Sequence, residues 1–71
     1  SLTGTEFRLL RCLMARPGQL FSKELLVEQL YSLNDEAGHN TIEVYIRRLR
    51  RIIGQEAIIT HRGQGYAFRG E

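Results

Sequence analysis

The chain has 71 residues, of which 42% are hydrophobic and 25% are charged. This composition is typical of one small soluble globular domain and argues against disorder or a collagen-like repeat. No apolar run approaches the roughly 20 residues that a membrane-spanning helix requires. The single cysteine, Cys12, excludes an internal disulfide and favours a reducing compartment. We therefore expect one domain over residues 1–71.

Positive charge is concentrated in one third of the chain. Between residues 40 and 62, five arginines oppose only Glu43 and Glu56, which gives +3, whereas the remaining residues sum to −1. The planar guanidinium of arginine binds phosphates and guanine edges bidentately. This asymmetry, more than the overall net charge of +2, indicates an anionic partner.

The first predicted helix covers about residues 4–15. Thr3 and Glu6 have the spacing of a capping box, which marks a helix start. Apolar residues then recur at helical spacing until Pro17-Gly18, where neither residue continues a helix comfortably. The apolar residues of this helix are Phe7, Leu9, Leu10, Leu13 and Met14.

A second helix is expected after Ser22, which is suited to be its N-cap. It carries apolar residues as far as Tyr31. Residues 32–39 contain almost nothing apolar and predict a solvated loop.

The third predicted helix covers residues 41–53, with Gly54 placed to end it. Advancing about 100° per residue separates an apolar face from a basic face. The apolar face consists of Ile42, Ile46, Leu49 and Ile53, flanked by Tyr45 and Ile52. The opposite face consists of Val44, Arg47, Arg48 and Arg51, with Glu43 and Arg50 along its border.

Two short strands are expected at the C-terminal end, over residues 57–60 and 66–68, because β-branched and aromatic residues dominate them. Residues 61–65 supply two glycines and Arg62, as a hairpin turn with a basic tip requires. The predicted fold class is mostly α with a small β-hairpin wing.

This element order predicts a winged helix-turn-helix that binds double-stranded DNA. The helix over 41–53 would lie in the major groove, and the wing over 61–65 would place Arg62 in the minor groove. Thr41 and Thr60 would contact phosphates. No acid other than Glu43 is expected to face the helix arginines. Two alternatives stay open from the residues alone: a solvated arginine face, and a protein-interaction module whose arginine face docks an acidic partner.

Other chemistry has little support. His39 and His61 have no cysteine or acid at metal-ligand spacing, and Cys12 has no nearby base that would activate it. No nucleophile, base and orienting group converge, so we expect neither an enzyme nor a small-molecule substrate, and neither a cofactor nor a metal.

Four segments resemble the effector domain of the OmpR/PhoB family of response regulators, in order along nearly the whole chain. They read LTGTEFRLL at 2–10, FSKEL at 21–25, NTIEVYIRRLR at 40–50 and THRGQGY at 60–66, with Pro17-Gly18 between the first two. The resemblance implies a winged helix-turn-helix transcription factor of a bacterial two-component system, located in the cytoplasm and controlled by phosphorylation of a separate receiver domain.

The resemblance also implies partners and site residues. Family members bind direct repeats as tandem dimers, and the loop corresponding to residues 32–39 is implicated in contacts with RNA polymerase. The DNA-contacting positions of the family correspond to Thr41, Val44, Tyr45, Arg47, Arg48, Arg50, Thr60, Arg62, Gly63 and Tyr66. Helical spacing adds Arg51, which lies on the same outer helix face, to the expected DNA contacts.

The sequence departs from the family pattern at several places. Asn40, Tyr45 and His61 stand where Arg, His and Val or Ile are frequent. The antiparallel sheet that normally starts the family domain is missing, which suggests a piece of a larger response regulator. Without that sheet, we expect the first helix to expose an apolar patch that invites self-association.

Overall fold

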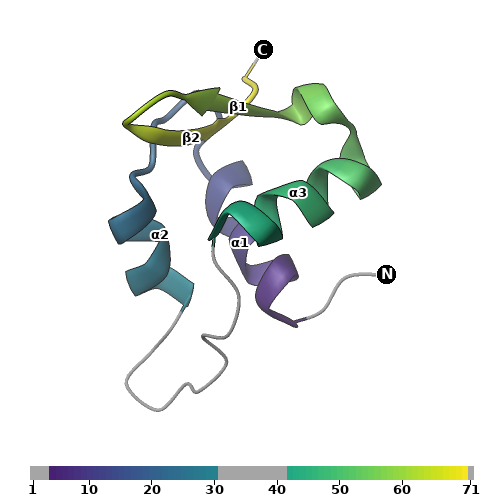
Figure 1. The fold of residues 1–71 in the computed structure, drawn as a ribbon, viewed down its shortest axis with the longest axis horizontal. Coiled ribbons are helices and arrows are strands. Elements are labelled where there is room, and N and C mark those ends of the chain that lie inside the picture. Colours follow the sequence, from purple (N-terminus) through teal and green to yellow (C-terminus); the bar gives the residue numbers. More distant parts are fainter. Residues whose placement is uncertain (1–3, 31–41, 71) are drawn as a thin grey trace.

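Three helices and a hairpin make up the part of the chain that the structure describes. The computed structural model describes residues 4–30 and 42–70. The helices are α1 (Gly4–Met14), α2 (Lys23–Leu30) and α3 (Ile42–Ile53), and a short 3-10 turn, η1 (Gln55–Ala57), follows them. The strands β1 (Ile58–His61) and β2 (Gly65–Phe68) form an antiparallel hairpin that lies across one end of the helices (Figure 1).

One core holds these elements together. Each helix presents a leucine- or isoleucine-rich face to the other two, and β1 adds one isoleucine from the hairpin. Burial of one such side chain contributes about 1.5–3 kcal/mol, so the core is the main stabilising term for this small domain. The largest fully buried side chains are Leu9, Leu13, Leu26, Leu30, Ile46, Leu49 and Ile58.

The hairpin is attached to the helices through the connector between α1 and α2. Phe21 and Tyr66 form an isolated antiparallel bridge, in which each backbone N–H donates to the other residue's carbonyl, at 2.8 and 2.9 Å. The neighbouring Gly65 has a φ of 146°, and a Cβ there would overlap the Phe21 carbonyl oxygen. Only glycine therefore allows β2 to approach the connector this closely.

The predicted fold class and helix positions are confirmed. The helix predicted over 4–15 is Gly4–Met14, and the one predicted over 41–53 is Ile42–Ile53 among the described residues. The Ser22 hydroxyl accepts a hydrogen bond from the Leu25 N–H at 3.1 Å, which confirms the N-cap.

The strands are shifted slightly from the prediction. They occupy Ile58–His61 and Gly65–Phe68 instead of 57–60 and 66–68, since Ala57 belongs to η1. His61 is paired with Gly65 inside the ladder, so the turn itself is shorter than residues 61–65.

The first helix exposes apolar side chains, as expected. Phe7 is 52% and Met14 48% exposed, while Leu9, Leu10 and Leu13 face the core.

Several other predictions lie outside the described residues: the cap at Thr3, the helix position of Tyr31, the loop over 32–39, and the roles of Asn40 and Thr41.

Candidate nucleic-acid interface

The outer face of α3 presents Arg47 and Arg51 to solvent. Both side chains are exposed, and neither forms an ion pair with another described residue. Their spacing of four residues places them one turn apart on the same face, with the half-buried Val44 one turn before Arg47. These three side chains form the arginine face as the structure has it.

Arg48 lies beside this face and is paired with a residue of α1. Its Nη1 lies 3.3 Å from Oε2 of Glu6 on α1, and Glu6 is buried. The prediction that no acid besides Glu43 faces the helix arginines is therefore wrong. The physical reason is that a carboxylate at the α1–α3 contact needs a cationic partner, and Arg48 is the arginine turned towards α1.

Arg50 joins α3 to the wing. Its Nε and Nη2 donate to the Ile58 carbonyl oxygen at 3.2 and 2.6 Å, and Nη2 also donates to Thr60 Oγ1 at 2.8 Å. Three bonds from one planar fork fix the first strand of the wing against the end of α3. The structure thus gives Arg50 and Thr60 a shared role in positioning the wing.

The two tyrosines carried over from the family pattern lie in the core. Tyr45 is 4% and Tyr66 8% exposed, and both pack in the hydrophobic cluster. Tyr45 lies on the apolar side of α3 and not with Arg47 and Arg51, and its predicted DNA contact stays a prediction. Tyr66 supports the hairpin through its bridge to Phe21.

The turn of the wing carries Arg62 and Gly63 at its exposed end. Gly63 has a φ of 74° with open space around it, and the Gln64 N–H donates to the His61 carbonyl at 2.8 Å to close the turn. Arg62 is exposed and forms no ion pair with the described part of the chain. The hairpin therefore presents a guanidinium group to solvent at its turn.

A groove of about 390 Å³ separates the wing from the starts of α2 and α3. Arg62 and Thr60 lie on one side of it, and Lys23 and Glu43 lie on the other. Lys23 Nζ is 2.5 Å from Glu43 Oε2, and this hydrogen bond, with the attraction of the carboxylate, raises the pKa of Lys23.

Sequence reasoning missed Lys23 as part of this surface. The residue follows the N-cap of α2, and the sequence gives only its place in the first turn of that helix. No local pattern brings that turn beside the first turn of α3, because the pairing with Glu43 spans 20 positions of the chain.

Within residues 4–30 and 42–70, no group of histidine, cysteine and acidic side chains is arranged to hold a metal ion. The same residues include no helix that is long and apolar enough to cross a membrane.

Three helices with a basic outer face on the third, followed by a hairpin with an arginine at its turn, define a winged helix-turn-helix. The family model for the C-terminal domain of transcriptional regulatory proteins matches residues 1–68. The chain belongs to this family, the OmpR/PhoB-type effector domains of response regulators.

Curated relatives agree with this assignment. The chain is 46% identical to the two-component response regulator PhoP of Pseudomonas aeruginosa, over 96% of this chain and 32% of PhoP. It is 42% identical to the transcriptional regulatory protein PmrA of Pectobacterium parmentieri, over 92% of this chain and 29% of PmrA. The chain thus spans about a third of the length of these relatives.

Solved structures show the same fold. The C-terminal domain of the nisin resistance regulator NsrR, a lantibiotic response regulator, matches with a TM-score of 0.78 at 37% identity, over 99% of this chain and 75% of that one. The DNA-binding domain of Bacillus subtilis CssR gives 0.76 at 28% identity, over 96% and 77%. The DNA-binding domain of AdeR in complex with an intercistronic region gives 0.80 at 23% identity, over 99% and 74%, which supports the fold alone.

Proposed function

We propose that this chain binds double-stranded DNA sequence-specifically and regulates transcription as the output domain of a bacterial two-component response regulator. The observation that carries the proposal is the joint exposure of Arg47 and Arg51 on α3 and Arg62 on the wing. These three guanidinium groups come from the two elements that a winged helix-turn-helix applies to a duplex. None of them is neutralised by another described residue.

In the proposed complex, the helix over 41–53 enters the major groove, which is wide enough to admit an α-helix. Arg47 and Arg51 then reach base edges or the flanking phosphates, and Val44 offers an apolar contact to a thymine methyl group. The wing over 61–65 follows the DNA backbone into the adjacent minor groove, where Arg62 meets a strongly negative electrostatic potential. Gly63, which has no side chain, lets the turn approach the DNA backbone closely.

Residues that do not face the duplex directly have supporting roles in this proposal. Arg50 sets the angle between helix and wing through its bonds to Ile58 and Thr60. Arg48 pairs with Glu6 of α1, and because half of its side chain is exposed it stays proposed as a DNA contact as well. Thr41 stays proposed as a phosphate contact.

Further parts of the proposal concern the whole protein. Tandem dimers on direct repeats, a contact of residues 32–39 with RNA polymerase, a phosphorylated receiver domain and a cytoplasmic location all follow from the family resemblance. The relatives named above are response regulators or transcriptional regulatory proteins and are about three times as long as this chain, which supports a separate receiver domain.

Selection of bound sequences from a random duplex pool tests the proposal. We expect one enriched motif, and Arg47→Ala should weaken binding to that motif by about 1–3 kcal/mol while affecting a random duplex less. Arg11→Ala, which removes the same charge from α1, is the matched control and should bind like the parent chain. Absence of any enriched motif contradicts sequence-specific binding.

A further inference from the structure

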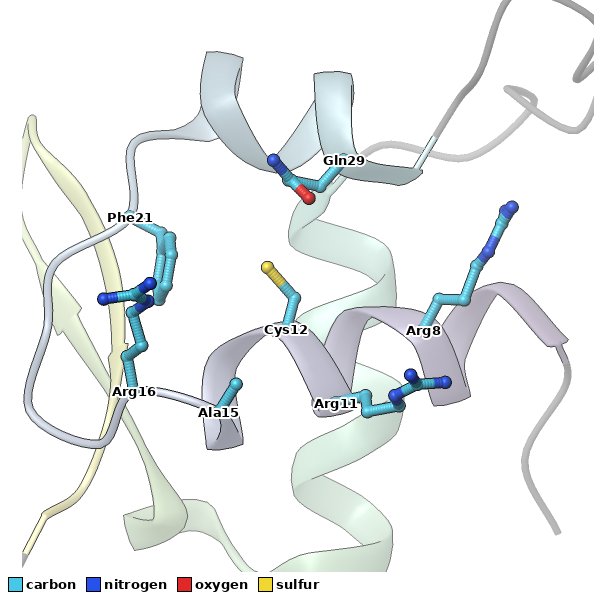
Figure 2. Close-up of a pocket in the computed structure, with 7 residues that line it drawn as sticks. All are labelled: Arg8, Arg11, Cys12, Ala15, Arg16, Phe21 and Gln29. Atoms are coloured by element: carbon cyan, nitrogen blue, oxygen red, sulfur yellow. The ribbon is translucent and has the colours of Figure 1, made fainter.

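A second basic site lies between α1 and α2. A pocket of about 500 Å³ is bordered by Arg8 and Arg11 of α1, by Arg16 just after it, and by Gln29 of α2 (Figure 2). Cys12 and Phe21 form its floor. In Figure 2, Arg8 stands at one end of the pocket and Arg16 with Phe21 at the other, while the Cys12 thiol points towards α2. We call this site the arginine pocket.

Two arginines of the arginine pocket, Arg11 and Arg16, have no ion-pair partner among the described residues. Three arginines border it, and no carboxylate is among its lining residues. Arg8 donates to the Leu30 carbonyl oxygen at 2.8 Å, which ties it to the end of α2. Arg11 and Arg16 are exposed and form no ion pair with other described residues. An anionic occupant would neutralise the charges of Arg11 and Arg16.

The floor of the pocket is apolar. Phe21 is only 6% exposed and belongs to the core, and the neighbouring Cys12 is half-buried. Desolvation raises the pKa of the Cys12 thiol, so at neutral pH the floor carries no charge. A guanidinium rim over a neutral floor suits a ligand that has both carboxylates and an apolar side chain.

The arginine pocket is separate from the proposed DNA-binding surface. It shares no lining residue with the groove between the wing and the starts of α2 and α3. In Figure 2, α3 runs behind α1 while the pocket side chains stand in front of it. A single straight duplex held by α3 and the wing therefore leaves this pocket open, and a pocket between two helices does not match the convex surface of a second duplex.

We propose that the arginine pocket docks an acidic segment of a partner protein. Carboxylates of the segment pair with Arg11 and Arg16, and one of its apolar side chains rests on Cys12 and Phe21. Arginine clusters recognise acidic motifs in this way because each guanidinium can hold a carboxylate bidentately. The site lies on a different face from α3, so a DNA-bound chain can still take this partner.

A labelled peptide of alternating glutamate and leucine is the probe, and the same peptide with glutamine for glutamate is its control. Binding is measured by fluorescence anisotropy at low salt with the whole chain. The double variant Arg11→Glu with Arg16→Glu should lose about tenfold or more in affinity for the acidic peptide. Arg47→Glu with Arg51→Glu makes the same charge change on α3 and should lose less than about twofold.

The same two variants should show the reverse order with duplex DNA, where only the α3 pair weakens binding strongly. Equal loss of peptide affinity in both variants shows a non-specific charge effect and overturns the proposal. Comparable weakening of DNA binding by the pocket pair overturns it too, because the pocket then belongs to the DNA-binding surface.

Protection of Cys12 gives a test that needs no substitution. The acidic peptide should slow the alkylation of this single thiol by iodoacetamide, both in the free chain and in the chain bound to duplex DNA. The glutamine peptide and inorganic phosphate should each slow the alkylation less than the acidic peptide does. Equal protection by phosphate shows a general anion site, and no protection by the acidic peptide shows that the pocket is not its docking site. Either result overturns the proposal, whether or not the variants fold.

Discussion

Arg48 Nη1 on α3 lies 3.3 Å from Oε2 of Glu6 on α1, joining residues that are 42 positions apart. The Glu6 side chain is 5% exposed and that of Arg48 is 50% exposed, so one partner is desolvated and the other reaches solvent. A buried carboxylate that loses a cationic partner is costly, and Arg48 therefore helps to hold α3 on α1.

Arg48→Ala should lower the free energy of unfolding by about 1–3 kcal/mol, because it leaves the Glu6 carboxylate without this partner. Adding Glu6→Gln should recover part of the loss. Urea unfolding of the two single variants and the double variant measures the coupling. Simple additivity of the single effects contradicts the pairing.

Arg50→Lys should loosen the wing although it keeps the charge. A lysine supplies one compact ammonium group in place of the planar guanidinium of Arg50, which donates both to the Ile58 carbonyl oxygen and to Thr60 Oγ1. We expect faster amide hydrogen exchange over residues 58–61 and a loss of about 1–2 kcal/mol of stability. Thr60→Val removes one of the three hydrogen bonds and should have a smaller effect. Unchanged exchange in Arg50→Lys contradicts the positioning role.

Gly65→Ala should separate β2 from the connector between α1 and α2. Its backbone φ of 146° disfavours any side chain, and the new Cβ would overlap the Phe21 carbonyl oxygen. We expect a loss of about 2–4 kcal/mol, measured by thermal unfolding. Gly63→Ala is the matched control, because its φ is also positive but nothing lies within 4 Å of the new Cβ. Equal losses for the two variants contradict the close approach at Gly65.

Cys12 should be less reactive in the folded chain than in the unfolded chain. Burial raises its pKa, so at any pH near neutrality the folded state holds a smaller fraction of reactive thiolate. The linked contribution to stability is present below the unfolded pKa and decreases as the pH rises through that value towards the folded pKa. Iodoacetamide rates against pH, with and without denaturant, check this. A folded midpoint at or below the unfolded one contradicts it.

The sequence predicts the elements of this fold closely and the roles of the arginines less well. Helical spacing of apolar residues places α1 and α3 within a residue or so, because local periodicity determines which face is buried. The same periodicity places Arg48 beside Arg47 on the outer face. Only the packing of α1 against α3 shows that Arg48 pairs with Glu6.

The residues of the candidate DNA-binding site were also only partly predictable from the sequence. The exposure of Arg47, Arg51 and Arg62 agrees with the pattern, since each lies where no core residue is needed. The family pattern does not indicate that Tyr45 is buried, whereas the structure packs this large aromatic ring, on the border of the apolar stripe, into the core. The net charge outside residues 40–62 did not indicate the arginine pocket either. Acidic residues elsewhere in the chain offset the charges of Arg8, Arg11 and Arg16 in that net charge.

The slope of log K against log salt for duplex binding tests the central claim most directly. Each phosphate contact contributes about 0.9 units to that slope, so Arg62→Ala should lower its magnitude by about one unit, and the triple variant with Arg47→Ala and Arg51→Ala by about two to three. Arg11→Ala with Arg16→Ala should leave it unchanged. A slope in the triple variant equal to that of the parent chain would show that α3 and the wing do not form the DNA-binding surface.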